Sequence, residues 1–241
     1  MTALPPYRRS ALLLDLDGTL LDLAPTPDSV IVPAGLPEAL LTIKRQLDGA
    51  LAVVTGRAID TIDALLGDVP HAVAGEHGGA VRAFPGAAIE RPDLQAPPAH
   101  WLESAAALEK AHPGALFEQK PRGFGLHFRL AEDAGPAIHQ ALTGLLGDSE
   151  DFFLMGGNMM WEVRPRGVDK GHAVTRLMRA APFLDRVPIF IGDDVTDEDG
   201  MRVARAMGGI GLRVQDVFGD AAGVRAWLHD TAAAADWGKL P

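Results

Sequence analysis

Two aspartates near the N-terminus have the spacing of a paired catalytic site. Asp15 and Asp17 follow the apolar run 11–14, which predicts a short strand buried on both faces. Side chains alternate along a strand, so the two carboxylates project in the same direction. Two carboxylates held this close repel each other unless a cation, a proton or a reaction accounts for them. The plainer interpretation is two loop aspartates after a core strand, and the pair alone does not decide between the two.

A second acidic group follows the predicted strand 187–191. It comprises three carboxylates within five residues, Asp193, Asp194 and Asp197. Open α/β sheets gather their functional groups at the carboxyl ends of the strands, so we expect this group to lie near Asp15. Ligands that are all oxygen atoms favour a hard cation, and the sequence therefore predicts a Mg²⁺ site. The alternative is an acidic helix N-terminus, where carboxylates stabilise the helix dipole.

A phosphate-binding group is predicted after another strand, 50–54. Thr55 offers a hydroxyl, the backbone near Gly56 offers N–H donors, and Lys170 offers a positive charge at the start of a later helix. No P-loop motif occurs, which argues against nucleotide binding by that route. Read alone, Lys170 has the plainer interpretation of a solvated surface lysine.

Composition limits the possible partners. The 241 residues are 47% hydrophobic and 22% charged, which is typical of a globular protein. A net charge of −10 argues against nucleic-acid and anionic-membrane partners, so an anionic substrate must find a local basic pocket. There is no cysteine, which excludes disulfides and thiolate chemistry. No apolar run is long enough for a membrane span or a signal peptide, so we expect a cytoplasmic monomer.

The elements that must position these residues form an interrupted α/β pattern. Strands and helices alternate from the first strand to residue 74, and the same pattern returns after Gly167, which predicts a parallel sheet covered by helices on both faces. Between them the order is helix, strand, strand, twice over, which predicts a small antiparallel sheet with two helices on one face. The predicted domains are therefore a discontinuous core, 1–98 and 167–241, and an inserted α+β domain, 99–166.

Taken together, the four motifs carry a family resemblance. The segments 15–19 (DLDGT), 55–57 (TGR) and 192–198 (GDDVTDE), with Lys170, resemble in this order the haloacid dehalogenase superfamily of aspartate-nucleophile phosphatases. The resemblance implies a Rossmannoid parallel-sheet core with an inserted α+β cap of the C2 type. It also implies that the two aspartates of the first motif carry the chemistry.

The resemblance assigns a role to each matching residue. Asp15 is implied to be the nucleophile that accepts the phosphoryl group, and Asp17 the acid and base that serves the leaving oxygen and the attacking water. Thr55 and Lys170 are implied to bind the phosphoryl group. Mg²⁺ is implied to bind Asp15, the carbonyl oxygen of Asp17 and Asp193, with support from the remaining two carboxylates, Asp194 and Asp197.

The chain also resembles one family within this superfamily, the bacterial trehalose-6-phosphate phosphatases. The segments that carry this likeness are 74–79 (AGEHGG), 114–129, 161–171 (WEVRPRGVDKG) and 192–200 (GDDVTDEDG). The resemblance implies that Glu118, Lys120 and Glu162 bind the sugar, and that Gly56 and Arg57 help to bind the phosphorylated substrate. It implies trehalose 6-phosphate as the substrate. One departure is Ala80, where the family usually has a glutamate.

Three alternatives remain open. The same chemistry could act on another sugar phosphate, such as that of mannose, sucrose or glycerol, because the core motifs are shared. A signalling receiver domain also uses clustered Asp, Thr and Lys, but its core is not interrupted by a cap and its nucleophile does not sit beside a second Asp on the first strand. A catalytically inactive binding module is the third, and the presence of every required side chain argues against it.

Overall fold

The protein consists of two compact units. The structure, a computed structural model, describes residues 4–240, apart from the side chain of Pro27. One unit comprises the chain up to Arg91 together with the chain from Val168 onward, and the other is Pro92–Gly167. The outermost ends of the predicted core, residues 1–3 and 241, lie outside the described residues.

The first unit is built on a six-stranded sheet in the order β10-β9-β1-β2-β3-β4. Its strands are β1 (Ser10–Leu14), β2 (Leu51–Val54), β3 (Ala72–Gly75), β4 (Ala80–Arg82), β9 (Val187–Gly192) and β10 (Ile210–Arg213). All neighbours pair in parallel except β4, which is antiparallel to β3 at one edge. The predicted α/β fold is therefore confirmed, with an antiparallel edge strand that the short segment 80–82 did not reveal.

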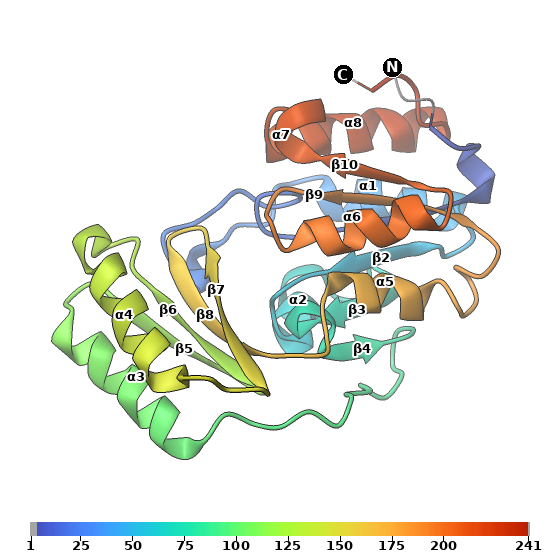
Figure 1. The fold of residues 1–241 in the computed structure, drawn as a ribbon. Helices are drawn as coiled ribbons and strands as arrows, with labels where there is room; N and C mark the ends of the chain where they lie inside the picture. Colours follow the sequence, from blue (N-terminus) through green and yellow to red (C-terminus); the bar gives the residue numbers. More distant parts are fainter. Residues whose placement is uncertain (1–3, 241) are drawn as a thin grey trace. The chain divides into compact units, whose positions relative to one another are not determined.

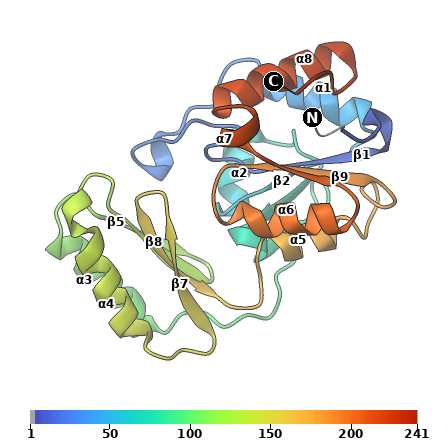
Figure 2. The ribbon, with the colours of Figure 1, turned by 45° about the horizontal axis from the view of Figure 1, so that its top comes forward.

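Helices cover both faces of this sheet. They are α1 (Leu36–Gln46), α2 (Ile59–Leu66), α5 (Lys170–Leu177), α6 (Asp197–Ala206), α7 (Val214–Val217) and α8 (Ala221–Ala234). α1 and α8 pack together on one face, and α5 and α6 pack together on the other (Figure 1, Figure 2). α1 connects β1 to β2, and α6 connects β9 to β10 on the other side of β1. Crossovers of one hand that run in opposite directions along the sheet place their helices on opposite faces. No helix within residues 4–240 is long and apolar enough to cross a membrane.

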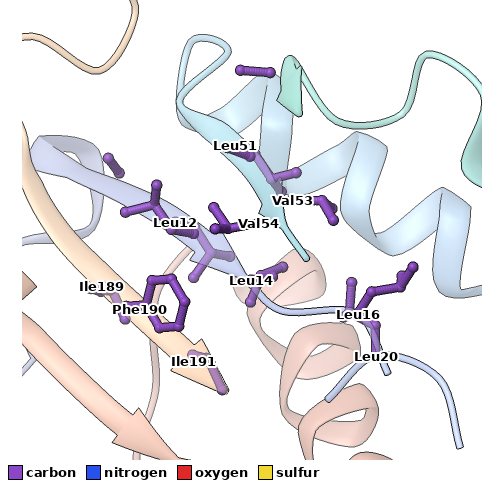
Figure 3. Packing of buried hydrophobic residues seen from close by; sticks show 14 of the residues in the cluster. Leu12, Leu14, Leu16, Leu20, Leu51, Val53, Val54, Ile189, Phe190 and Ile191 are labelled. Atoms are coloured by element: carbon purple, nitrogen blue, oxygen red, sulfur yellow. The ribbon is translucent and has the colours of Figure 1, made fainter. Parts of the chain in front are cut away.

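The centre of the sheet fixes the strand end that carries Asp15. All five residues of β1 are buried, and Figure 3 shows Leu12 and Leu14 between the side chains of β2 and β9. Leu14 is in register with Val53 on one side and Ile191 on the other. Burying one such side chain contributes ~1.5–3 kcal/mol, so the end of β1 has little freedom to move.

The second unit is a four-stranded antiparallel sheet, β5-β6-β8-β7, with two helices on one face (Figure 1). Its elements are α3 (Ala99–Ala111), β5 (Leu116–Lys120), β6 (Gly123–His127), α4 (Gly135–Leu146), β7 (Phe152–Gly157) and β8 (Met160–Pro165). Phe124 and Leu126 of β6 pack with Ile138 and Leu142 of α4 in a core separate from that of the first unit. By strand alternation, the intervening residues of β6 point to the other face, which no helix of this unit covers.

Two local features differ from the predicted elements. The two glycines and the asparagine of segment 156–158 predict a three-residue turn, but β7 extends to Gly157, which is in register with Met160. Met159 takes a left-handed backbone conformation (φ 58°) that closes the remaining two-residue turn. The short helix α7, which directly follows β10, lacked a periodic pattern because it spans only one turn.

Candidate active site

A lysine bridges two buried carboxylates at the carboxyl end of the first sheet. The Nζ atom of Lys170 lies 2.6 Å from Oδ1 of Asp15 and 2.7 Å from Oδ1 of Asp197. The three side chains are 3%, 5% and 0% exposed. Lys170 is the first residue of α5, and the helix is held there because Asp169 caps it, accepting a hydrogen bond from the N–H of His172. Segments 155 residues apart in sequence therefore meet at one charged group.

The electrostatics of this group are those of closely packed like charges around one cation. Burial raises the pKa of Asp15 well above its usual range, and the charges of Asp197 and Asp193 add to the rise while Lys170 opposes it. Burial alone would lower the pKa of Lys170. The two carboxylates that it contacts raise this pKa by more than burial lowers it, so the ammonium group stays charged. A group with excess buried negative charge attracts a further cation.

Asp193 completes a set of oxygen ligands. Asp15, Asp193 and Asp197 each offer one carboxylate oxygen within 4.8 Å of the others. Among the described residues, the buried Oδ1 of Asp193 has no hydrogen-bond partner. Burial, with the charges of Asp197 and Asp194, raises the pKa of Asp193 to about 6. Clustered, oxygen-only and incompletely paired, these ligands fit a hard divalent cation.

Gly18 allows Asp193 to approach the first motif. Its φ is +81°, and a Cβ atom there would lie 2.2 Å from Oδ2 of Asp193. Any other residue would therefore both strain the turn and displace the carboxylate. The close contact between the turn after β1 and the turn after β9 depends on this glycine.

Asp17 is held by Arg57 in a two-point ion pair. Nε of Arg57 lies 2.6 Å from Oδ2 of Asp17, and Nη2 lies 2.7 Å from Oδ1. Such fork-like pairs are directional and stronger than single contacts. In this arrangement both carboxylate oxygens of Asp17 accept hydrogen bonds from one guanidinium group. The side chain of Asp17 is 30% exposed, much more than that of Asp15.

Thr55 and Gly56, which are predicted to bind phosphate, directly follow β2 and pack against a loop with a strained backbone. The side chain of Thr55 is buried. The backbone carbonyl oxygen of Thr55 accepts a hydrogen bond from the backbone N–H of His77. A Cβ atom on Gly56 would lie 2.3 Å from Nε2 of His77, so the loop packs directly on the glycine. Glu76 and His77 both have φ of 54°, a conformation that non-glycine residues rarely adopt and that often marks functional sites. Ala80, the departure noted in the sequence, is buried in β4.

Asp194 and Asp197 contribute to the shape of the turn after β9. Oδ1 of Asp194 accepts from the N–H of Val195, and the N–H of Asp194 donates to Oδ2 of Asp197. Both oxygens of Asp197 thus have protein donors, one of them Lys170. The carboxylate of Asp194 is outside the 4.8 Å group described above. These two residues orient the turn that carries Asp193.

A second polar cluster lies within the inserted unit. Lys120 Nζ lies 2.6 Å from Oε1 of Glu162, and Nε2 of His127 lies 2.8 Å from Oε2 of Glu118. Burial would lower the pKa of Lys120, but the charges of Glu162 and Glu118 raise it by more. The three residues predicted to bind a sugar therefore share one sheet face. His127 is the member that the sequence interpretation missed, and applying strand alternation to 123–127 would have placed it on that face.

Comparison with known proteins identifies close relatives. A family model described as trehalose-phosphatase matches residues 13–224. A probable trehalose-phosphate phosphatase of Sinorhizobium fredii is 38% identical over 205 residues, 85% of this chain and 77% of that protein. The trehalose-6-phosphate phosphatase of Escherichia coli is 35% identical over 212 residues, again 85% of this chain and 77% of that protein.

Solved structures share the fold. The C-terminal domain of the trehalose-6-phosphate phosphatase of C. albicans superposes with a TM-score of 0.80 at 19% identity, covering 94% of this chain and 93% of that chain. The sucrose-phosphatase of Synechocystis superposes with a TM-score of 0.57 at 17% identity, covering 95% of this chain and 99% of that chain. At these identities the likeness supports the haloacid dehalogenase fold and not a particular substrate.

Proposed function

The chain belongs to the trehalose-phosphatase family, and on this premise we propose that it hydrolyses trehalose 6-phosphate to trehalose and inorganic phosphate. The observation that carries the chemistry is the buried contact of Lys170 with Asp15 and Asp197. A carboxylate can approach a phosphate group only where positive charge screens both, and this contact supplies such charge at the end of β1.

Asp15 is the proposed nucleophile. Its carboxylate oxygen attacks phosphorus, the bond from phosphorus to the sugar oxygen breaks, and an aspartyl phosphate forms. Thr55, the backbone at Gly56 and Lys170 bind the phosphoryl oxygens during this step. Water then attacks phosphorus, phosphate departs, and the carboxylate of Asp15 is restored.

Asp17 is the proposed acid and base. It gives its proton to the departing sugar oxygen and later takes one from the attacking water, which is typically worth ~10²–10⁴-fold in rate. In the structure both of its oxygens accept from Arg57. Asp17 therefore has to leave this pair and take up a proton from solvent before it can act as the acid, and the released guanidinium can then bind an anionic phosphate oxygen.

The carboxylate group fits a divalent ion, which we propose is Mg²⁺. Asp15, Asp193 and the carbonyl oxygen of Asp17 would hold it, and Asp194 and Asp197 would support them. When bound, Mg²⁺ would neutralise charge that develops on the transferring phosphoryl group. The buried, unpaired Oδ1 of Asp193 supports this assignment.

The inserted unit, Pro92–Gly167, is the proposed sugar-recognition cap. Glu118, Lys120 and Glu162 combine two carboxylates with one ammonium group, and such side chains bind several hydroxyls of a disaccharide through charge-assisted hydrogen bonds. The enzyme is proposed to work as a cytoplasmic monomer. The alternative, another sugar phosphate as substrate, depends only on what this cap accepts.

Phosphate release from a panel of sugar phosphates in the presence of Mg²⁺ tests the proposal. We expect a kcat/KM for trehalose 6-phosphate at least about 100-fold above those for glucose 6-phosphate and sucrose 6-phosphate, the size that a few well-placed polar contacts provide. Comparable values for trehalose 6-phosphate and glucose 6-phosphate would refute the substrate while leaving the phosphatase chemistry in place.

A further inference from the structure

The face of the inserted sheet that no helix of its own unit covers carries a row of polar residues around a glycine. Gly125 of β6 is in register with Glu118 of β5 on one side and Glu162 of β8 on the other. A Cβ atom at Gly125 would lie 3.8 Å from both Oε2 of Glu118 and Nε2 of His127, and 2.9 Å from Cε of Met160. The two carboxylates thus flank Gly125, and the missing Cβ atom leaves room above it for the side chains of Glu118, His127 and Met160.

Each carboxylate in this row is held by its own partner. Lys120 contacts Oε1 of Glu162, and His127 contacts Oε2 of Glu118. An ionised carboxylate can only accept, so Nε2 of His127 must be the donor in the second pair. Burial would raise the pKa of Glu118, but the hydrogen bond from His127 and the charges of Lys120 and His127 lower it on balance, which keeps the carboxylate ionised.

The second oxygen of Glu118 is available for a ligand. Within residues 4–240, Oε1 of Glu118 has no hydrogen-bond partner, and the side chain is 32% exposed. His127 is 19% exposed and lies on the face away from α3 and α4, so it is not part of the apolar core of this unit. Through the contact of its Nε2 atom, this histidine stabilises the orientation of Glu118.

We propose that His127 is a positioning residue for sugar recognition, which fixes Oε2 of Glu118 so that Oε1 accepts a hydrogen bond from a hydroxyl of the phosphorylated disaccharide. This inference rests on the proposed function. The physical gain is pre-organisation: a glutamate side chain has several rotatable bonds, and one that is already held loses less conformational freedom when the sugar binds. His127 acts only through Glu118 and does not touch the reacting atoms.

The test compares two substrates in His127→Phe and His127→Gln. Phe removes the donor and keeps a ring, so we expect kcat/KM for trehalose 6-phosphate to fall ~10–100-fold, mainly through KM, as for a lost hydrogen bond to a charged group. Hydrolysis of p-nitrophenyl phosphate, which has no sugar, should change less than about twofold. Gln offers an N–H donor at a similar reach and should restore most of the loss. His139→Phe, an exposed histidine on α4, is the matched control and should behave like the wild type.

A double variant separates positioning from direct contact. If His127 acts through Glu118, then His127→Phe combined with Glu118→Ala should be no worse than Glu118→Ala alone. Additive losses, equal losses on both substrates, unchanged hydrolysis of trehalose 6-phosphate in His127→Phe, or failure of Gln to rescue would each overturn the inference. If instead the wild type shows no preference for trehalose 6-phosphate, the proposed function is wrong and the inference falls with it.

Discussion

Lys170 in the first unit and Lys120 in the inserted unit both contact carboxylates at 2.6 Å, but in different surroundings. Lys170 is 3% exposed and touches two carboxylates whose own exposures are 5% and 0%. Lys120 is 14% exposed and contacts one carboxylate, that of Glu162, which is 8% exposed. Lys170 is buried among carboxylates that outnumber it, whereas Lys120 is more exposed and is paired with one carboxylate.

The difference in burial and charge between the two clusters indicates a division of function between phosphoryl transfer and sugar recognition. Charge that must act on a phosphoryl group is most effective where water is excluded, so Asp15, Lys170 and Asp197 come together from distant segments at a buried strand end. Groups that bind hydroxyls must remain reachable. Glu118 and Lys120 on β5 and Glu162 on β8 lie on either side of β6, on a sheet face that no helix of their unit covers. Changes in the first cluster should affect every substrate, and changes in the second only the sugar.

Asp15→Asn should have the largest effect. It keeps the size of the side chain but removes the nucleophilic carboxylate, so we expect kcat to fall at least about 10⁴-fold on trehalose 6-phosphate and on p-nitrophenyl phosphate alike. The measurement is phosphate release with Mg²⁺ present, beside a thermal melt to show that the variant folds. Substantial turnover by Asp15→Asn would show that the cluster of Asp15, Lys170 and Asp197 does not carry out the phosphoryl transfer.

Lys170→Met should come next. It leaves Asp15 and Asp197 buried without their cation, so we expect the free energy of unfolding to fall by ~3–5 kcal/mol. Turnover of both substrates should fall by ~10²–10³-fold, as for loss of one charge-stabilising donor. Denaturant unfolding and the two activity assays measure this. Loss on trehalose 6-phosphate alone would show that Lys170 serves the sugar, contrary to the division described.

Lys120→Met is the matched change in the inserted unit. It removes one partner of Glu162 and one ammonium group for the sugar, so kcat/KM for trehalose 6-phosphate should fall ~10–100-fold. Hydrolysis of p-nitrophenyl phosphate should change less than about twofold. An equal loss on the two substrates would indicate that this lysine supports the chemistry as well.

The pH dependence of stability should give the smallest effect. In the metal-free protein the pKa of Asp193 is raised to about 6, above its value in the unfolded chain. The folded state is therefore more stable when Asp193 is protonated than when it is ionised. The folded state then binds the extra proton, and this contribution to stability is present at pH 4 and lost as the pH rises through about 6. We expect Asp193→Asn to raise Tm at pH 7 by ~2–4 °C, the shift that ~1 kcal/mol produces in a chain of this length, and to have less effect at pH 5. A fall in Tm at pH 7 would contradict this sign.

Much of the candidate active site at the end of the first sheet could be predicted from the sequence, for a physical reason. Strands that end in polar residues bring those residues to one edge of a parallel sheet, so Asp15, Thr55 and Asp193 could be placed together before any geometry was known. The bounds of helices α2 and α4 also follow from the sequence, because each has a clear apolar period and is followed directly by a glycine.

The remaining features needed coordinates. The pair between Arg57 and Asp17 depends on side-chain rotamers, which a sequence does not specify. The antiparallel edge strand β4 has only three residues, too few for a periodic pattern. The contact between His127 and Glu118 depends on the register of β5 with β6, and that register depends on the turn between them.

The most direct test of the division between the two units is the selectivity of Glu118→Ala. The quantity is kcat/KM for trehalose 6-phosphate divided by kcat/KM for p-nitrophenyl phosphate, measured with Mg²⁺ for the wild type and the variant. We predict that the ratio falls ~10–100-fold because a charge-assisted hydrogen bond to the sugar is lost, while the rate on p-nitrophenyl phosphate is unchanged. An unchanged ratio, or a parallel loss on both substrates, would contradict the assignment of sugar recognition to the inserted unit.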